Sequence, residues 1–287
     1  MKTASIPLGE FEQRIANIRQ AMAARGVDAF FVYGDEYRKE NLRYVSNYWP
    51  IFERGGMLLG REGTPVVLCA PEGEQVAREM SVWPDVRLLP DFLCVTVPDE
   101  IDYPLATYTS FRALAAELRQ KGPLGKLGVA GLKDMPAVLL KSIEAAFRCE
   151  IADCADVLFD LRKRKSENEI ACLREAARIA EAGFRAMMGA DLIGKTERYA
   201  AGIAEGVARR EGAEAVIFTV FGSGDRSARI IGRPEEKIIE DGDMIMCALA
   251  IQYEGYVSTC EYPFAVGNYS EKTRRVLDVL INASAKG

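Results

Sequence analysis

The sequence predicts an α/β domain followed by an α+β domain, and three patterns carry this prediction. Along the first half of the chain, short apolar runs alternate with amphipathic stretches, as strands and helices of an α/β domain do. Two long helical patterns then come in succession, and three extended runs follow them. Between the two regions lies the basic run Arg162–Lys165, which we interpret as a domain junction rather than an address signal. We therefore expect domains at 1–157 and 158–287.

The first domain is expected to begin with an amphipathic helix that ends at Gly26. Its apolar residues recur at helical spacing: Phe11, Ile15, Ile18 and Met22. Strands are expected at Ala29–Tyr33, 57–59, 66–69 and Leu127–Ala130. Helices are expected near 109–121 and 136–148. The stretch 61–64, which contains Gly63, is a hairpin signal between the second and third of these strands.

The second domain is expected to open with a capping box, in which Ser166 and Glu169 each satisfy a free amide at a helix start. The buried stripe of that helix consists of Ile170, Leu173, Ala177, Ala180 and Phe184. A second helix should begin at Thr196 and run to about Arg210. Strands should follow at Val216–Phe221, Met244–Ile251 and Tyr256–Val266, with a tight turn at Asp241–Asp243. A last amphipathic helix is expected from about Ser270.

Composition and charge exclude several classes of protein. Lys and Arg number 37 and Asp and Glu 42, a net charge of −5, which argues against a dedicated nucleic-acid binder. The seven cysteines are scattered and form no CxxC pair, so we expect neither a disulfide framework nor a zinc knuckle. We find no signal-peptide core and no apolar run of about 20 residues, so we expect a cytoplasmic protein without membrane contact.

The sequence contains no histidine. This excludes Ser-His-Asp and Cys-His catalysis by residues of this chain and removes the commonest general base near neutral pH.

Several short motifs, in order, resemble the pita-bread superfamily of creatinase, prolidase, aminopeptidase P and methionine aminopeptidase. The entry to the second domain, Arg164-Lys165-Ser166-x-x-Glu169-Ile170, resembles the family's R-x-K-S-x-x-E-I with one residue lost. The later landmarks are Gly194-x-Thr196-Glu197, Ser223-Gly224, Gly242-Asp243 and Gly255-Tyr256-x-Ser258. The resemblance implies a creatinase/prolidase N-terminal domain followed by a pita-bread catalytic domain, of which 158–287 would be the first half.

Two positions depart from the metal-dependent members of this superfamily. Those members place one Asp before the Gly-Tyr pair and another after the Ser, and the two carboxylates grip a dinuclear metal centre. Counting from Gly255 puts Ala248 and Thr259 there. A methyl group cannot bind a divalent ion, and one hydroxyl is a poor substitute for a bridging carboxylate. The family's other ligands, a His and two Glu, would lie beyond Gly287, so we expect no metal and no cofactor.

Creatinase works without metal, and its resemblance to this chain implies substrate contacts. Glu261 stands where its glutamate contacts the substrate guanidinium, and Phe52 and Arg54 match a Phe-x-Arg pair that reaches the neighbouring subunit's site. Asp225 and Arg229 lie in the family's substrate-side loop. We therefore expect a homodimer whose N-terminal domain contributes to its neighbour's site, acting on a small molecule or short peptide.

One substitution argues against creatine hydrolysis itself. The family's acid–base histidine corresponds to Ile231, and its loss would cost about 10²–10⁴-fold in rate. The catalytic residues therefore remain unknown.

Three functions are compatible with these residues. The first is a creatinase-like hydrolase that cleaves a C–N bond of a small nitrogen-rich substrate without metal. The second is an inactive relative that binds a peptide or protein, favoured by the absence of histidine. The third is a truncated relative of the metal-dependent Xaa-Pro peptidases.

Overall fold

The structure, a computed structural model, describes residues 4–94 and 107–286, and these form two compact units that divide after Lys165. Ala4 and Ser5 join the second unit. Helix α6 (Ala155–Lys163) belongs to the first unit because its Val157 and Leu158 are buried in that unit's core. The division therefore lies later than the expected boundary between 157 and 158, and the basic run Arg162–Lys165 leads directly into it.

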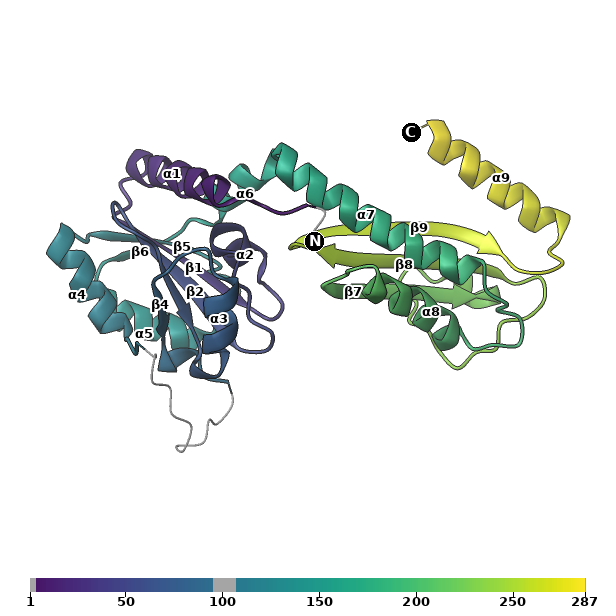
Figure 1. The fold of residues 1–287 in the computed structure, drawn as a ribbon, viewed down its shortest axis with the longest axis horizontal. Helices are drawn as coiled ribbons and strands as arrows, with labels where there is room; N and C mark the ends of the chain where they lie inside the picture. The colour runs from purple at the N-terminus through teal and green to yellow at the C-terminus, as the bar shows by residue number, and fades with distance from the viewer. Residues whose placement is uncertain (1–3, 95–106, 287) are drawn as a thin grey trace. The chain divides into compact units, whose positions relative to one another are not determined.

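The first unit is built on a six-stranded mixed sheet in the order β4-β3-β2-β1-β5-β6 (Figure 1). Its strands are β1 (Ala29–Asp35), β2 (Arg54–Gly60), β3 (Val66–Cys69), β4 (Val86–Leu88), β5 (Lys126–Ala130) and β6 (Glu150–Asp153). The predicted hairpin is present, since β2 and β3 pair antiparallel on either side of Gly63. β1 pairs antiparallel with β2 and parallel with β5, so it lies at the centre of the sheet.

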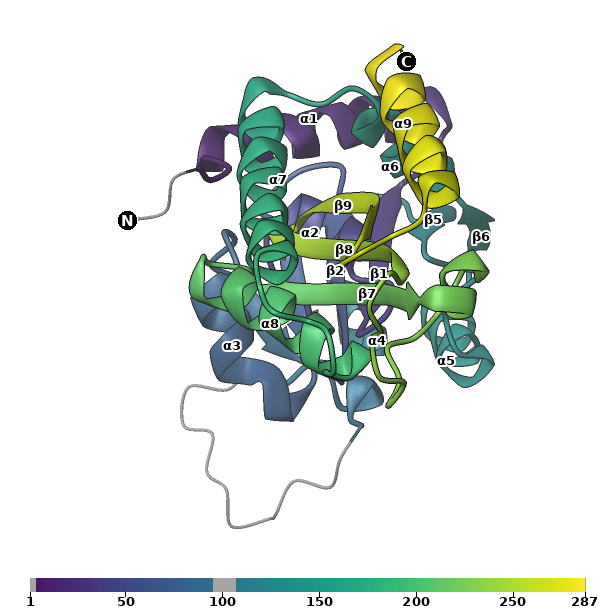
Figure 2. The ribbon, with the colours of Figure 1, turned by 90° about the vertical axis from the view of Figure 1, so that its right-hand side faces the viewer.

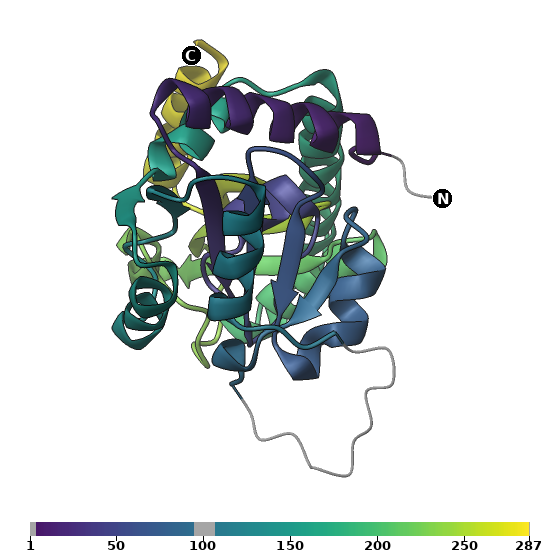
Figure 3. The ribbon, with the colours of Figure 1, turned by 90° about the vertical axis from the view of Figure 1, so that its left-hand side faces the viewer.

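Helices cover both faces of this sheet (Figure 3). Besides α6 they are α1 (Leu8–Ala24), α2 (Glu40–Ser46), α3 (Glu74–Met80), α4 (Phe111–Lys121) and α5 (Ala137–Phe147), with short 3₁₀ turns η1 (Pro71–Gly73) and η2 (Pro90–Phe92). Phe30 and Val32 pack against α1, α2 and α6, whereas Phe31 and Tyr33 pack against α4 and α5. This alternation along β1 gives the unit two apolar layers, one on each side of the sheet.

The second unit has a three-stranded antiparallel sheet in the order β7-β8-β9 (Figure 2). Its strands are β7 (Ala215–Ser223), β8 (Met244–Tyr253) and β9 (Tyr256–Ala265). Its helices are α7 (Glu167–Met188), α8 (Glu197–Arg210), the 3₁₀ turn η3 (Gly224–Ala228) and α9 (Glu271–Lys286). The predicted capping box is confirmed, because Ser166 Oγ accepts from the Glu169 amide at 3.1 Å and Glu169 accepts from the Ser166 amide at 2.8 Å.

Helices α7 and α8 pack on one face of this sheet. Gly183 of α7 permits the close approach, since a Cβ there would lie 2.6 Å from the Ala204 carbonyl oxygen of α8 and 3.0 Å from Leu249 Cδ2 of β8. Leu249 therefore faces the helices. The phenyl ring of Phe184 packs edge-on against Tyr262 and Phe264 of β9, with ring centroids 6.1 Å apart in each pair. These contacts fix which face of each strand the helices cover.

Candidate functional site

The candidate site is the face of the β7-β8-β9 sheet that α7 and α8 do not cover, which we call the open face. Because Leu249 faces the helices, its neighbours Ala248 and Ala250 face the other way. Ala248 pairs with Glu261 on β9 and with Val220 on β7, and Ala250 pairs with Thr259. The open face therefore carries Phe218, Val220, Met246, Ala248, Ala250, Thr259 and Glu261.

Strand alternation predicts that Glu261 and Thr259 share a face with Ala248, and the structure places them so. Both side chains are exposed, whereas the Ala248 methyl is buried. Cys260, between them, pairs with Leu249 and so lies on the helix-covered face. Partial burial raises its pKa, as does the nearby Glu181 of α7, which agrees with the ordinary interpretation of a sheet thiol rather than a nucleophile.

The residues of the open face do not fit the dinuclear metal centre of the metal-dependent relatives. The two strand positions offer a methyl group and a single hydroxyl, at Ala248 and Thr259. Divalent ions of this kind need several carboxylate or imidazole donors. Within residues 4–94 and 107–286, no three His, Cys, Asp or Glu side chains come together in a group that could hold a metal ion.

The loop after β7 carries the two predicted polar residues, Asp225 and Arg229. Asp225 lies in η3 and is exposed, and Arg229 is 60% exposed with its guanidinium 4.0 Å from Glu235. Gly224 starts η3 with a positive φ of 56°, and a Cβ there would lie 2.7 Å from Asp243 Oδ1. The Ser-Gly and Gly-Asp landmarks of the sequence therefore meet in space.

Ile231, at the family's histidine position, is 84% exposed, and its neighbour Ile230 is 91% exposed. An isoleucine has no group that can carry a proton, so the structure gives this position no acid–base role.

A buried carboxylate that sequence reasoning did not assign to the site lies beneath this loop. Glu197, the first residue of α8, is fully buried and accepts hydrogen bonds from the Ser223 amide and hydroxyl at 2.9 Å, from Arg226 Nε at 3.1 Å and from the Glu235 amide at 3.0 Å. Burial raises the pKa of Glu197, but these hydrogen bonds outweigh burial and hold the pKa below its ordinary value. The sequence did contain a signal that could have pointed to this carboxylate, because Glu197 and Ser223 both stand in motifs that resemble those of the family.

The Phe-x-Arg pair lies in the first unit, just before and at the start of β2. Phe52 is 51% exposed, and its amide donates to the buried Glu53 carboxylate at 3.0 Å. Glu53 also accepts from the Ile51 amide at 3.1 Å and from the Tyr48 hydroxyl at 3.2 Å, so it fixes the loop that presents Phe52. Arg54 pairs with Asp35 in the sheet register, and Asp35 Oδ2 accepts a hydrogen bond from the Tyr33 hydroxyl at 3.2 Å. The pKa of Tyr33 is raised, mainly by burial.

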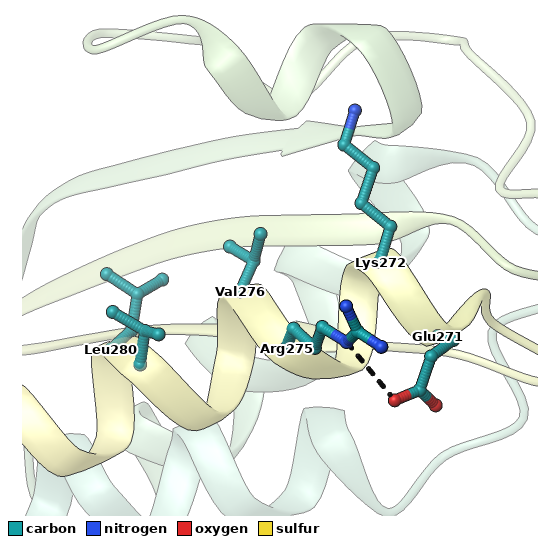
Figure 4. Close-up of a pocket in the computed structure, with 6 residues that line it drawn as sticks. Glu271, Lys272, Arg275, Val276 and Leu280 are labelled. Atoms are coloured by element: carbon teal, nitrogen blue, oxygen red, sulfur yellow. Dashed lines mark hydrogen bonds and ion pairs between the residues drawn. The ribbon is translucent and has the colours of Figure 1, made fainter.

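A hollow of about 550 Å³ runs along α9 and offers no second site (Figure 4). The residues that line it all come from α9: Glu271, Lys272, Arg275, Val276, Val279 and Leu280. Arg275 and Glu271 pair with each other at 3.4 Å. The hollow is therefore a surface of one helix rather than a cleft between elements.

Comparison with protein families assigns both units. The Creatinase/Prolidase N-terminal domain matches residues 14–163, and metallopeptidase family M24 matches residues 171–287. The chain belongs to the creatinase/prolidase family. The predicted architecture, an N-terminal domain of that family followed by a shorter pita-bread domain, is confirmed.

Two relatives of this family member carry the name Xaa-Pro dipeptidase. The chain is 26% identical over 277 residues to an Xaa-Pro dipeptidase of Pyrococcus furiosus, spanning 96% of this chain and 71% of the relative. It is 34% identical over 132 residues to an Xaa-Pro dipeptidase of Pyrococcus horikoshii, of which it spans 38%. Neither name is that of a creatinase, so assignment to the creatinase branch stays a prediction from the site residues.

Solved structures agree on the fold. The prolidase of Pyrococcus horikoshii OT3 matches with a TM-score of 0.75 at 24% identity, covering 96% of this chain and 71% of that one. An X-Pro aminopeptidase of Thermotoga maritima MSB8 matches with a TM-score of 0.77 at 23% identity, covering 94% and 69%. Among the helices in the described residues, none has the length and apolar character that crossing a bilayer requires.

Proposed function

We propose that this member of the creatinase/prolidase family is a hydrolase that cleaves a C–N bond of a small nitrogen-rich substrate without a metal ion. The observation that carries the proposal is the pair formed by Ala248 and Glu261 across β8 and β9. The position that binds metal in the peptidases is a methyl group, and a carboxylate stands directly beside it on the open face. The relatives' hydrolase names support the broad class of reaction.

Glu261 suits recognition of a cationic nitrogen group. The Glu261 side chain is exposed, and its cross-strand neighbour on the open face is the small, buried side chain of Ala248. A carboxylate holds a guanidinium or ammonium group through charge-assisted hydrogen bonds, each contributing about 1.5–3 kcal/mol. Arg54, with Phe52, would hold the carboxylate end of such a substrate in a neighbouring subunit, because the planar fork of arginine matches a carboxylate.

The sequence limits how protons are moved in such a reaction. It contains no histidine, so any proton carrier from this chain is a carboxylate, tyrosine, lysine or cysteine. Asp225 is an exposed carboxylate in the loop after β7.

A second candidate is a binding protein without turnover. The exposed Ile231 at the histidine position favours it, since the superfamily's acid–base group is missing there. Both candidates require Glu261 for binding, and only the first requires it for catalysis.

The test is an assay of the purified chain on two substrates, guanidinoacetate and an Xaa-Pro dipeptide, each with excess chelator and with added Mn²⁺ or Co²⁺. We expect release of product from guanidinoacetate in chelator and a fall of about 10- to 150-fold in kcat/KM in Glu261→Gln. Glu271→Gln, an exposed carboxylate of α9, is the matched control.

Two other outcomes have a definite meaning. Dipeptide cleavage that requires the metal would contradict the proposal and favour a metal-dependent peptidase. Binding of guanidinoacetate that Glu261→Gln abolishes, with no turnover by either protein, would favour the binding protein.

A further inference from the structure

The buried Glu197 joins two segments that are far apart in the sequence. Its two carboxylate oxygens together accept hydrogen bonds from Ser223 at the end of β7, from Arg226 in η3 and from the Glu235 amide. Arg226 continues the network, because its guanidinium also pairs with the Glu235 carboxylate at 2.9 Å and donates to the Arg233 carbonyl at 2.7 Å. The network thus fixes both ends of the loop 224–235.

This loop begins on the open face of the sheet. Phe221 pairs with Cys247, which, two residues before Leu249 on β8, faces the helices, so Gly222 faces the open side. A Cβ on Gly222 would lie 2.5 Å from the Arg226 carbonyl oxygen, so η3 folds directly over this glycine. Gly222 pairs with Met246, two residues along β8 from Ala248. Gly222, over which η3 folds, therefore lies about 7 Å along the strands from the cross-strand row of Val220, Ala248 and Glu261.

Arg226 connects the two sides of the sheet. Its backbone lies over the open face at Gly222, whereas its guanidinium contacts Glu197, which belongs to the helix-covered side. The segment beyond it returns along the outer edge of β7, where the Phe221 amide donates to the Gly232 carbonyl at 3.0 Å.

The tip of the loop has little packing of its own. Ile230 and Ile231 are 91% and 84% exposed, and the Arg229 side chain is 60% exposed. Where this tip lies is therefore set by the contacts on either side of it, which are the Glu197–Arg226 network and the hydrogen bond from the Phe221 amide to the Gly232 carbonyl. A buried ion pair is weak evidence for stability, since an apolar pair of similar size stabilises a fold at least as well. Such a pair does fix the orientation of the two side chains, because the donors of the planar guanidinium lie at fixed angles to the carboxylate oxygens that accept from them.

We propose that Glu197 and Arg226 are positioning residues, which hold η3 over the open face at Gly222 and the segment after it at the edge of β7, and so place Asp225 and Arg229 relative to Glu261. The inference rests on the proposed function to the extent that the open face binds substrate. The position of the loop itself can be measured without any substrate.

The test compares the full chain with Glu197→Gln and Arg226→Lys by hydrogen exchange and by guanidinoacetate binding. Arg198→Gln is the control, because Arg198 is the neighbouring arginine of α8 and pairs with Glu236 at the surface. We expect exchange in 224–235 to rise at least 10-fold in Glu197→Gln, and less in Arg226→Lys, which keeps the charge. Peptides of β8 and β9 should exchange as in the unaltered chain.

Binding separates a positioning role from a purely structural one. We expect Kd for guanidinoacetate, or KM where it is turned over, to rise about 10-fold in Glu197→Gln while kcat changes less than 3-fold. If hydrogen exchange in 224–235 is unchanged in Glu197→Gln, the inference is overturned. It is also overturned if exchange rises there while Glu197→Gln binds guanidinoacetate with the same Kd as Arg198→Gln. If Glu197→Gln does not fold, the same criteria apply to Arg226→Lys. If the unaltered chain does not bind guanidinoacetate, the proposed function fails, and the exchange of 224–235 alone decides whether the pair holds the loop.

Discussion

At the scale of single residues, two positions of the open face lack the carboxylates that the metal-dependent members of the superfamily place there. Ala248 and Thr259 were located by counting from the family's Gly-Tyr landmark, which stands at the hairpin that joins β8 and β9. Its two loop residues, Glu254 and Gly255, have φ angles of 49° and 83°, as a two-residue turn of this kind requires. Pairing therefore runs without a shift from Tyr253 and Tyr256 to Ala248 and Glu261.

The pairing of Glu197 with Arg226 could not be derived in the same way. The two residues stand 29 positions apart, on a helix and in a loop, and no local pattern specifies which carboxylate an arginine will meet. Exposure of Ile231 is likewise a property of the folded loop, since an isoleucine in a sequence is more often buried than exposed.

The Glu197 carboxyl makes the stability of the chain sensitive to acid. Its pKa is held below its ordinary value in the folded protein, so it contributes stability above its unfolded pKa of about 4.3. That contribution is lost as the pH falls through the folded pKa. We predict that Glu197→Gln lowers the free energy of unfolding by about 1–3 kcal/mol at pH 7 and that the difference shrinks below pH about 4.

Urea unfolding of both proteins from pH 7 to pH 3 measures this difference. A difference in the free energy of unfolding that stays constant from pH 7 to pH 3 would show that the charge of Glu197 contributes nothing to stability.

At the scale of elements, long segments with several turns of periodicity were predicted well. α7, α8 and the three strands of the second unit all lie within a few residues of their expected positions. Sequence reasoning missed the short elements, which are α2, α3, α6, β4 and β6. A helix of seven residues or a strand of three repeats its apolar pattern too few times to be recognised, and contacts with the rest of the unit decide its structure.

The contact between α7 and α8 depends on the absence of one side chain. A Cβ at Gly183 would meet the Ala204 carbonyl oxygen at 2.6 Å, and backbone cannot move aside as a flexible side chain can. We predict that Gly183→Ala lowers the free energy of unfolding by about 1–3 kcal/mol.

Gly202→Ala, within α8, is the matched control. Nothing lies within 4 Å of a Cβ built there, so alanine's higher helix propensity should raise stability by about 0.5–1 kcal/mol. Chemical denaturation measures both variants, and equal effects of the two substitutions would contradict the packing described for Gly183.

At the scale of the whole molecule, the first unit has what a self-sufficient domain needs. Its six-stranded sheet has an apolar cluster on each face, and both clusters are formed by residues of that unit. We predict that a fragment of residues 6–165 folds alone, with cooperative thermal unfolding and mixed helix and strand signals in circular dichroism. A fragment that is unfolded by both measures would show that its core depends on the rest of the chain.

Family membership and the composition of the open face lead to different expectations about metal ions. The chain matches metallopeptidase family M24, and two of its relatives are named Xaa-Pro dipeptidases. The strand positions of the first two metal ligands in that family are Ala248 of β8 and Thr259 of β9 here. We infer that the chemistry of the site follows these residues rather than the family's common activity.

Thermal unfolding of the full chain with increasing Mn²⁺, Co²⁺ or Zn²⁺ tests this claim most directly, since an ion bound only by the folded protein raises Tm as it saturates its site. We predict the same Tm with chelator as with each ion. A saturable, stoichiometric rise in Tm would contradict the account.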